Sequence, residues 1–290
     1  MKSGYKNILV AYDGSDSSRY ALDQAVDFAR ATGAVISAVS AFVPRATLLD
    51  SIIGSQVEEA ERRFESSGHA GGEKSGQRYP AIEVIEARVT VHEAIITAAQ
   101  SKGIDLIVMG RRGLNPVERI MVGSVTARVI GYSPIDVLVV PLGAPFRWKR
   151  ALLATDGSHY SQAAKERALG LALASGIELK VIHVIDVPAE LYANDAEIKD
   201  ALVAEARNII EPIEREARHL DIGVEGFIEE GIAPIEILRS AQKAAVDFII
   251  IGSHGRTGIE RFLMGNVAER VIANDRYPVL VIKGGLDHGF

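Results

Sequence analysis

Two glycine-rich stretches have residue types and spacing that suit phosphate binding. The first reads GRRGLNPVERIMVGS, Gly110 to Ser124, and the second reads GSHGRTGIERFLMGN, Gly252 to Asn266. Both contain the pattern Gly-x2-Gly-x9-Gly. Glycine lets a ligand approach the backbone closely, and a helix start exposes N–H groups with partial positive charge. The first stretch therefore predicts two phosphate sites, at Gly110–Gly113 and at Gly123–Val125, where an apolar helical pattern begins.

Two further residue types support a ligand site. Ser124 is a predicted N-cap whose hydroxyl can donate to a phosphate oxygen. An Asp-Gly-Ser triplet follows the first apolar run of each half, at Asp13 and at Asp156, and its carboxylate suits ribose hydroxyls or a Mg²⁺-bound water. The alternative is that the glycines only turn the loops and that Asp13 caps the first helix. One copy leaves both interpretations open, whereas two copies favour the ligand site.

These residues recur because a whole domain is repeated. NILVAYDGSDSS returns as ALLATDGSHYSQ, GIDLIVMGRRG as AVDFIIIGSHG, and DVLVVP as PVLVIK. The repeat unit is too long for a solenoid and has the size of a domain. We predict a first domain at residues 1–143, a linker at 144–149 and a second domain at 150–290, with the boundary in the Gly- and Pro-containing LGAPFRWKR.

The elements that must position these loops are strands alternating with helices. Continuous Val, Ile and Leu runs indicate strands buried on both faces, and the alternation implies right-handed crossovers and a parallel sheet. The predicted class is α/β, with two tandem doubly wound domains of five strands flanked by helices. The expected strands are Ile8–Ala11, Val35–Val39, Ile82–Val89, Leu106–Met109 and Val137–Val140, then Ala151–Ala154, Leu179–Ile185, Val224–Ile228, Phe248–Ile251 and Val279–Ile282.

The composition excludes several classes of protein. Charged residues make up 24% and the net charge is −6, without a Lys- or Arg-rich block for nucleic acid. Cysteine is absent, which excludes disulfides and thiolate chemistry. No signal peptide or membrane-spanning run is evident, so we expect a cytoplasmic protein without a membrane partner. The polar segment 66–80 is expected to be a surface loop, either a tolerated insertion or a ligand lid.

Both halves resemble the universal stress protein family, whose nucleotide-binding members carry Gly-x2-Gly-x9-Gly-Ser/Thr after strand four and an Asp after strand one. The resemblance implies a tandem member with sheets in the order 3-2-1-4-5 that bind ATP, ADP or AMP, with or without Mg²⁺. By position, the implied nucleotide-binding residues are Ala11, Asp13, Ser40, Met109, Gly110, Arg112, Gly113, Gly123, Ser124 and Val125. Those of the second half are Thr155, Asp156, Val184, Ile251, Gly252, Gly255, Gly265, Asn266 and Val267.

The second copy departs from that pattern because Asn266 replaces Ser/Thr, from which we expect altered binding rather than its loss. Arg111-Arg112 stand where the second half has Ser253-His254, and they either bind anion or are solvated. His183 is expected to be structural, and His254 is a candidate ligand contact. Glu118 and Glu260 are candidate water-positioning groups, although surface charges are the more usual explanation.

No P-loop lysine, catalytic pair or metal-ligand spacing accompanies these motifs. We therefore expect an ATP-binding stress-response regulator rather than a dedicated enzyme. The alternatives are a slow ATPase or phosphotransfer enzyme and a nucleotide-independent interaction module. The last strands of the halves are expected to pair within the chain, with association into a homodimer and an unidentified protein partner.

Overall fold

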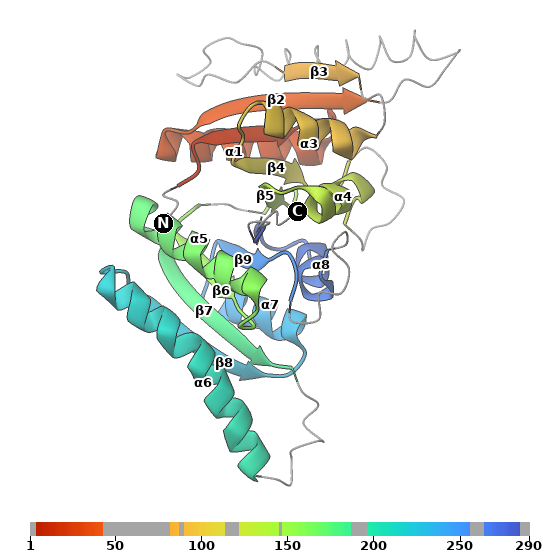
Figure 1. The fold of residues 1–290 in the computed structure, drawn as a ribbon. Coiled ribbons are helices and arrows are strands. Elements are labelled where there is room, and N and C mark those ends of the chain that lie inside the picture. The colour runs from red at the N-terminus through yellow and green to blue at the C-terminus, as the bar shows by residue number, and fades with distance from the viewer. Residues whose placement is uncertain are drawn as a thin grey trace, which may run out of the picture. The chain divides into compact units, whose positions relative to one another are not determined.

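The computed structural model describes residues 4–42, 82–86, 90–113, 122–144, 147–186, 196–255 and 264–284. Segment 66–80, Glu118 and Glu260 lie outside this part of the chain. The contacts divide the protein into two compact units, Tyr5–Gly143 and Ala144–Phe290. Apart from helix α6 (Ala196–His219) of the second unit, which stands where the first unit has residues outside the described ranges, both units have the same succession of strands and helices (Figure 1).

The first unit contains a parallel sheet in the order β3-β2-β1-β4-β5. Helix α1 packs on β1 and β4, and helices α3 and α4 pack against each other and on β2 and β5. The elements are β1 (Asn7–Ala11), α1 (Asp16–Thr32), β2 (Val35–Phe42), β3 (Ile82–Glu86), α3 (Val91–Ser101), β4 (Leu106–Gly110), α4 (Ser124–Tyr132) and β5 (Asp136–Val140).

The second unit contains a parallel sheet in the order β10-β9-β6-β7-β8, which is the same topology. Its helix α5 packs on β9 and β10, and α7 packs on β7 and α8. The elements are β6 (Arg150–Ala154), α5 (His159–Ser175), β7 (Glu178–Ile185), α6 (Ala196–His219), β8 (Val224–Glu230), α7 (Ala233–Lys243), β9 (Phe248–Gly252), α8 (Asn266–Ala273) and β10 (Val279–Ile282).

The predicted fold class and strand order are confirmed in both units. The central strands are apolar along their whole length because both faces are covered: every residue of β4 and of β9 is buried. Helix α1 ends at Gly33, as its pattern predicts, because that residue has the left-handed conformation (φ 73°) that glycine adopts most easily. Strand β2 continues to Phe42, past its predicted end at Val39.

Helix α6 runs beside β7 and β8, and β8 forms an edge of the second unit's sheet (Figure 1). Glu214 of α6 accepts a hydrogen bond from the Gly226 N–H of β8 at 2.9 Å. A Cβ at Gly226 would lie 2.8 Å from Glu214 Oε1 and would overlap Ile210, so a larger residue would require both side chains to move. Neither α6 nor any other helix in the described part of the chain has the length and apolar character of a membrane span.

Candidate functional site

The turn after the first strand of each unit is built in the same way. Asp13 Oδ1 accepts a hydrogen bond from the Ser15 N–H at 3.0 Å, and Asp156 Oδ1 accepts one from Ser158 at the same distance. Ser15 and Ser158 are the N-caps of α1 and α5. The alternative that Asp13 caps the first helix is therefore wrong. One carboxylate oxygen holds the turn, and the other faces the loop after the fourth strand.

The first glycine of each loop is a packing residue. A Cβ at Gly110 would lie 2.8 Å from the backbone carbon of Ser17 in α1. A Cβ at Gly252 would lie 2.9 Å from the backbone carbon of Tyr160 in α5. Real Cβ atoms do not approach backbone this closely, so the fourth strand can contact the helix only through glycine.

The second glycine lies against the aspartate. A Cβ at Gly255 would lie 2.8 Å from Asp156 Oδ2, and one at Gly113 would overlap Asp13 Oδ2. The loop backbone and the carboxylate therefore meet at the carboxyl end of the sheet, where ligands bind in this class of fold.

The third glycine closes the loop. Gly123 N–H donates to Arg111 O, and Gly265 N–H donates to Ser253 O, both at 2.9 Å. This bond places the start of the following helix beside the first two glycines of the loop. The spacing shared by the two halves thus has a geometric cause, since each glycine makes a close approach, and that of the first glycine is to helix backbone that cannot turn aside.

The helix starts differ from the prediction by one position. Gly123, not Ser124, is the N-cap of α4, and Ser124 is its first helical residue. Gly265 and Asn266 have the same places in α8. Ser124 and Asn266 are both exposed, so each side chain is available to a ligand beside the N–H groups of the first helical turn, which lack acceptors within the helix.

A cavity of about 480 Å³ opens at the carboxyl ends of β6, β7 and β9 in the second unit. All nine residues predicted for this half line it, namely Thr155, Asp156, Val184, Ile251, Gly252, Gly255, Gly265, Asn266 and Val267. The volume is within the usual range for small-molecule sites, roughly 300–1,000 Å³. The structure thus brings together residues that are more than one hundred positions apart in the sequence.

The cavity also contains residues that the sequence prediction missed. They are mainly apolar and come from β6, β7, α7 and the start of α8: Ala154, Ile182, Ala233, Ile237, Met264 and Ala268, with the polar Ser161. The prediction considered only segments after strands one, two and four. The start of α7 follows β8, whose carboxyl end lies at the same edge of the sheet, and this topology was the signal that could have identified Ala233 and Ile237.

Strand register relates these residues to the first half. Ala11 pairs with Val39, and Ala154 pairs with Ile182. Val184 therefore corresponds to Ala41, and Ser40 corresponds to His183, so the residues named for the second strand of each half, Ser40 and Val184, differ by one position in register. Side chains alternate between the faces of a strand, so Ser40 points away from the face shared by Val39 and Ala41. Ala11 itself lies beside Met109 of β4.

Hydrogen bonds of His183 and Thr155 fix the end of the first strand beside the cavity. His183 Nδ1 lies 2.9 Å from Thr155 O, which gives this histidine the structural role predicted for it. Thr155 Oγ1 donates to Ser161 Oγ at 3.2 Å. In the first half, Tyr12 stands at the position of Thr155 and is buried. The two halves therefore differ in chemistry at this point.

The loop side chains also differ between the halves. Arg111 is buried, with 2% exposed, and Arg112 is half-buried, so the description of this pair as solvated is wrong for Arg111. In the second half His254 lines the cavity. Among the described residues, no group of three or more His, Asp or Glu is placed to hold a metal ion.

Comparison with known proteins gives one family for both units. The sequence model of the "Universal stress protein family" matches residues 4–141 and 147–283. A universal stress protein of Mycolicibacterium smegmatis is 27% identical over 259 residues, covering 86% of this chain and 85% of the relative. One of Methanocaldococcus jannaschii is 34% identical over 142 residues, covering 47% of this chain and 82% of the relative. The crystal structure of a universal stress protein from Archaeoglobus fulgidus covers 97% of both chains with 24% identity and a TM-score of 0.71, which shows a common fold.

Proposed function

The chain belongs to the universal stress protein family, with two copies of the family's domain, and from this premise we propose that it is an adenine-nucleotide-binding regulator. ATP is the proposed ligand, with ADP and AMP as its shorter forms. The observation that carries the proposal is the cavity of the second unit, which combines an apolar wall, an acidic turn and a glycine-lined helix start. A universal stress protein has been solved in complex with cAMP; the proposal for this chain rests on its own cavity.

Each part of the cavity suits one part of a nucleotide. Ile182, Val184 and Ile237 form an apolar wall against which an adenine ring would lie, because flat aromatic groups are favourably removed from water there. Asp156 has a carboxylate oxygen directed to the loop and would accept hydrogen bonds from ribose hydroxyls. Gly255 and the start of α8 would bind phosphates through backbone N–H groups.

The proposal assigns regulation rather than turnover. Phosphoryl transfer needs a positioned nucleophile and neutralisation of the developing charge, and the described residues of the cavity contain one carboxylate and no Lys or Arg. A bound nucleotide would instead act by binding one state of the protein better than another. Pairing of the two halves through their last strands, and homodimer formation, remain predictions.

Filling the cavity tests the proposal. Ala233 is half-buried and lines the cavity at the start of α7, so Ala233→Trp places an indole where the nucleotide would lie. We expect ATP binding at the second unit, measured by calorimetry on the full chain with Mg²⁺, to weaken by at least about tenfold. Ile235→Trp is the matched control, because Ile235 belongs to the same helix and is 49% exposed. Absence of ATP binding by the unaltered chain at millimolar nucleotide would refute the proposal.

A further inference from the structure

The residue directly before the second glycine of each loop differs in type between the halves. Arg112 precedes Gly113, and His254 precedes Gly255. Their backbone positions match: the Cα atom of Arg112 lies 3.4 Å from the Cβ position of Gly123, and that of His254 lies 3.2 Å from the Cβ position of Gly265. Both side chains therefore leave the same point of the loop, beside the start of the following helix.

His254 is held in the wall of the second-unit cavity. It is 9% exposed and lines the cavity together with Gly255 and Asn266. Its Nδ1 lies 3.1 Å from Ser253 Oγ, and its ring packs on Tyr160 of α5 with the ring centroids 4.9 Å apart. Contacts on two sides restrict the rotation of the imidazole, so it is placed to meet the part of a ligand that lies at the helix start.

The described wall of this cavity offers little positive charge to that part of a ligand. Asp156 contributes a carboxylate, and no Lys or Arg is among the described lining residues. Apart from the imidazole, the donors of that described wall are uncharged, among them backbone N–H groups and the Asn266 amide. The first half has a guanidinium at the corresponding position, and its charge is permanent.

We propose that position 254 determines how much ligand charge the second-unit site accepts. With histidine there, this site distinguishes little between a nucleoside monophosphate and a nucleoside triphosphate. The first-unit site, with Arg112, favours the triphosphate. The inference rests on the proposed function, because it concerns which adenine nucleotide the same site selects.

Exchanging the residues between the halves tests this inference. His254→Arg is made in the full chain with Ser124→Asp, whose exposed carboxylate weakens phosphate binding at the first-unit helix start. AMP and ATP are titrated by calorimetry at pH 8. We expect the ratio of ATP affinity to AMP affinity to rise about tenfold, because a permanently charged donor then stands beside the phosphates. The reciprocal Arg112→His, in an Asn266→Asp background, should lower the ratio at the first-unit site by a similar factor.

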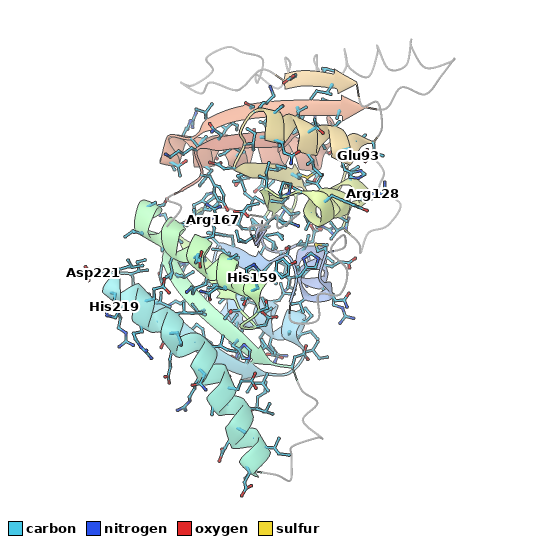
Figure 2. All side chains as sticks on the ribbon, viewed as in Figure 1. Glu93, Arg128, His159, Arg167, His219 and Asp221 are labelled. Atoms are coloured by element: carbon cyan, nitrogen blue, oxygen red, sulfur yellow. The ribbon has the colours of Figure 1, made fainter. Side chains whose placement is uncertain are left out.

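A matched control separates the local effect from a general change in charge. His219 lies at the end of α6 (Figure 2) and is exposed, so His219→Arg adds the same charge away from the cavity and should leave the ratio unchanged. An unchanged ratio in both exchange variants, with nucleotide binding intact, overturns the inference and leaves the proposed function standing. Failure of the unaltered chain to bind either nucleotide overturns both.

Discussion

Gly252→Ala should destabilise the second unit, although it adds only one methyl group. The new Cβ would lie 2.9 Å from the backbone carbon and oxygen of Tyr160 and 3.0 Å from its Cβ. Two of these three atoms belong to the backbone of α5, which cannot turn aside as a flexible side chain can. Strand β9 and helix α5 must therefore move apart, and the packing between them is lost along part of their contact.

Two opposing effects set the magnitude. Inserting a methyl group into a close-packed contact costs about 1–3 kcal/mol. Replacing glycine also lowers the entropy of the unfolded chain, which stabilises the fold by about 0.4–1 kcal/mol. The free energy of unfolding should therefore fall by about 1–2 kcal/mol, which shifts a urea midpoint by on the order of half to one molar.

The chain provides its own probe for this measurement. Trp148 is its single tryptophan, and its ring centroid lies 4.6 Å from that of Phe248 at the start of β9. Trp148 fluorescence therefore reports unfolding of the unit that contains Gly252. The matched control is Gly223→Ala, because a Cβ at Gly223 would meet no atom within 4 Å. A midpoint for Gly252→Ala equal to that of the unaltered chain would refute the packing argument.

Two further predictions concern other parts of the fold. Burial of His92 lowers its pKa; Glu93 opposes this effect and Arg128 adds a smaller lowering, and both residues are labelled in Figure 2. The fold thus favours the neutral imidazole. The contribution of His92 to the free energy of unfolding is therefore fully present above the ordinary pKa near 6.5 and decreases as the pH falls below it. Circular dichroism during urea unfolding at pH 8 and pH 5.5 should show this decrease, and His92→Asn should reduce it, whereas an equal decrease in the variant would contradict the assignment. Glu214→Ala should remove the acceptor of the Gly226 N–H at a cost of about 1 kcal/mol, and hydrogen exchange at Gly226 should then accelerate while Glu205→Ala, an exposed change on the same helix, leaves it unaltered.

The sequence was sufficient for the fold because its signals repeat. The apolar runs and the Asp-Gly-Ser and glycine motifs occur in the same order in both halves, so chance agreement is improbable, and their positions predict which loops meet at the carboxyl edge of the sheet. The register between neighbouring strands was harder to predict from the sequence. The runs place strand ends only to within a residue, which is why the residues named for the second strand of each half, Ser40 and Val184, are not counterparts: Val184 matches Ala41.

Individual contacts between distant segments were harder to predict than the meeting of the loops. The start of α7 was missed because Ala233 and Ile237 belong to an ordinary amphipathic pattern, and only the placement of β8 brings them to the cavity. The reasons for the glycines were also hidden, since Gly110 and Gly252 depend on Ser17 and Tyr160 of the first helix in each unit. A variant at either glycine therefore changes the packing of the fold as well as any ligand binding. Variants of cavity residues such as Ala233 are better tests of nucleotide binding.

The bond between Glu214 and the Gly226 N–H has a consequence for the behaviour of the protein at high concentration. An edge strand with an open donor can accept a strand from a second molecule, and such additions can continue into aggregates. Here a side chain from the neighbouring helix already occupies that donor, and an incoming strand would have to displace it first. The crossover helix that completes the fold thus also opposes strand addition at this point of β8.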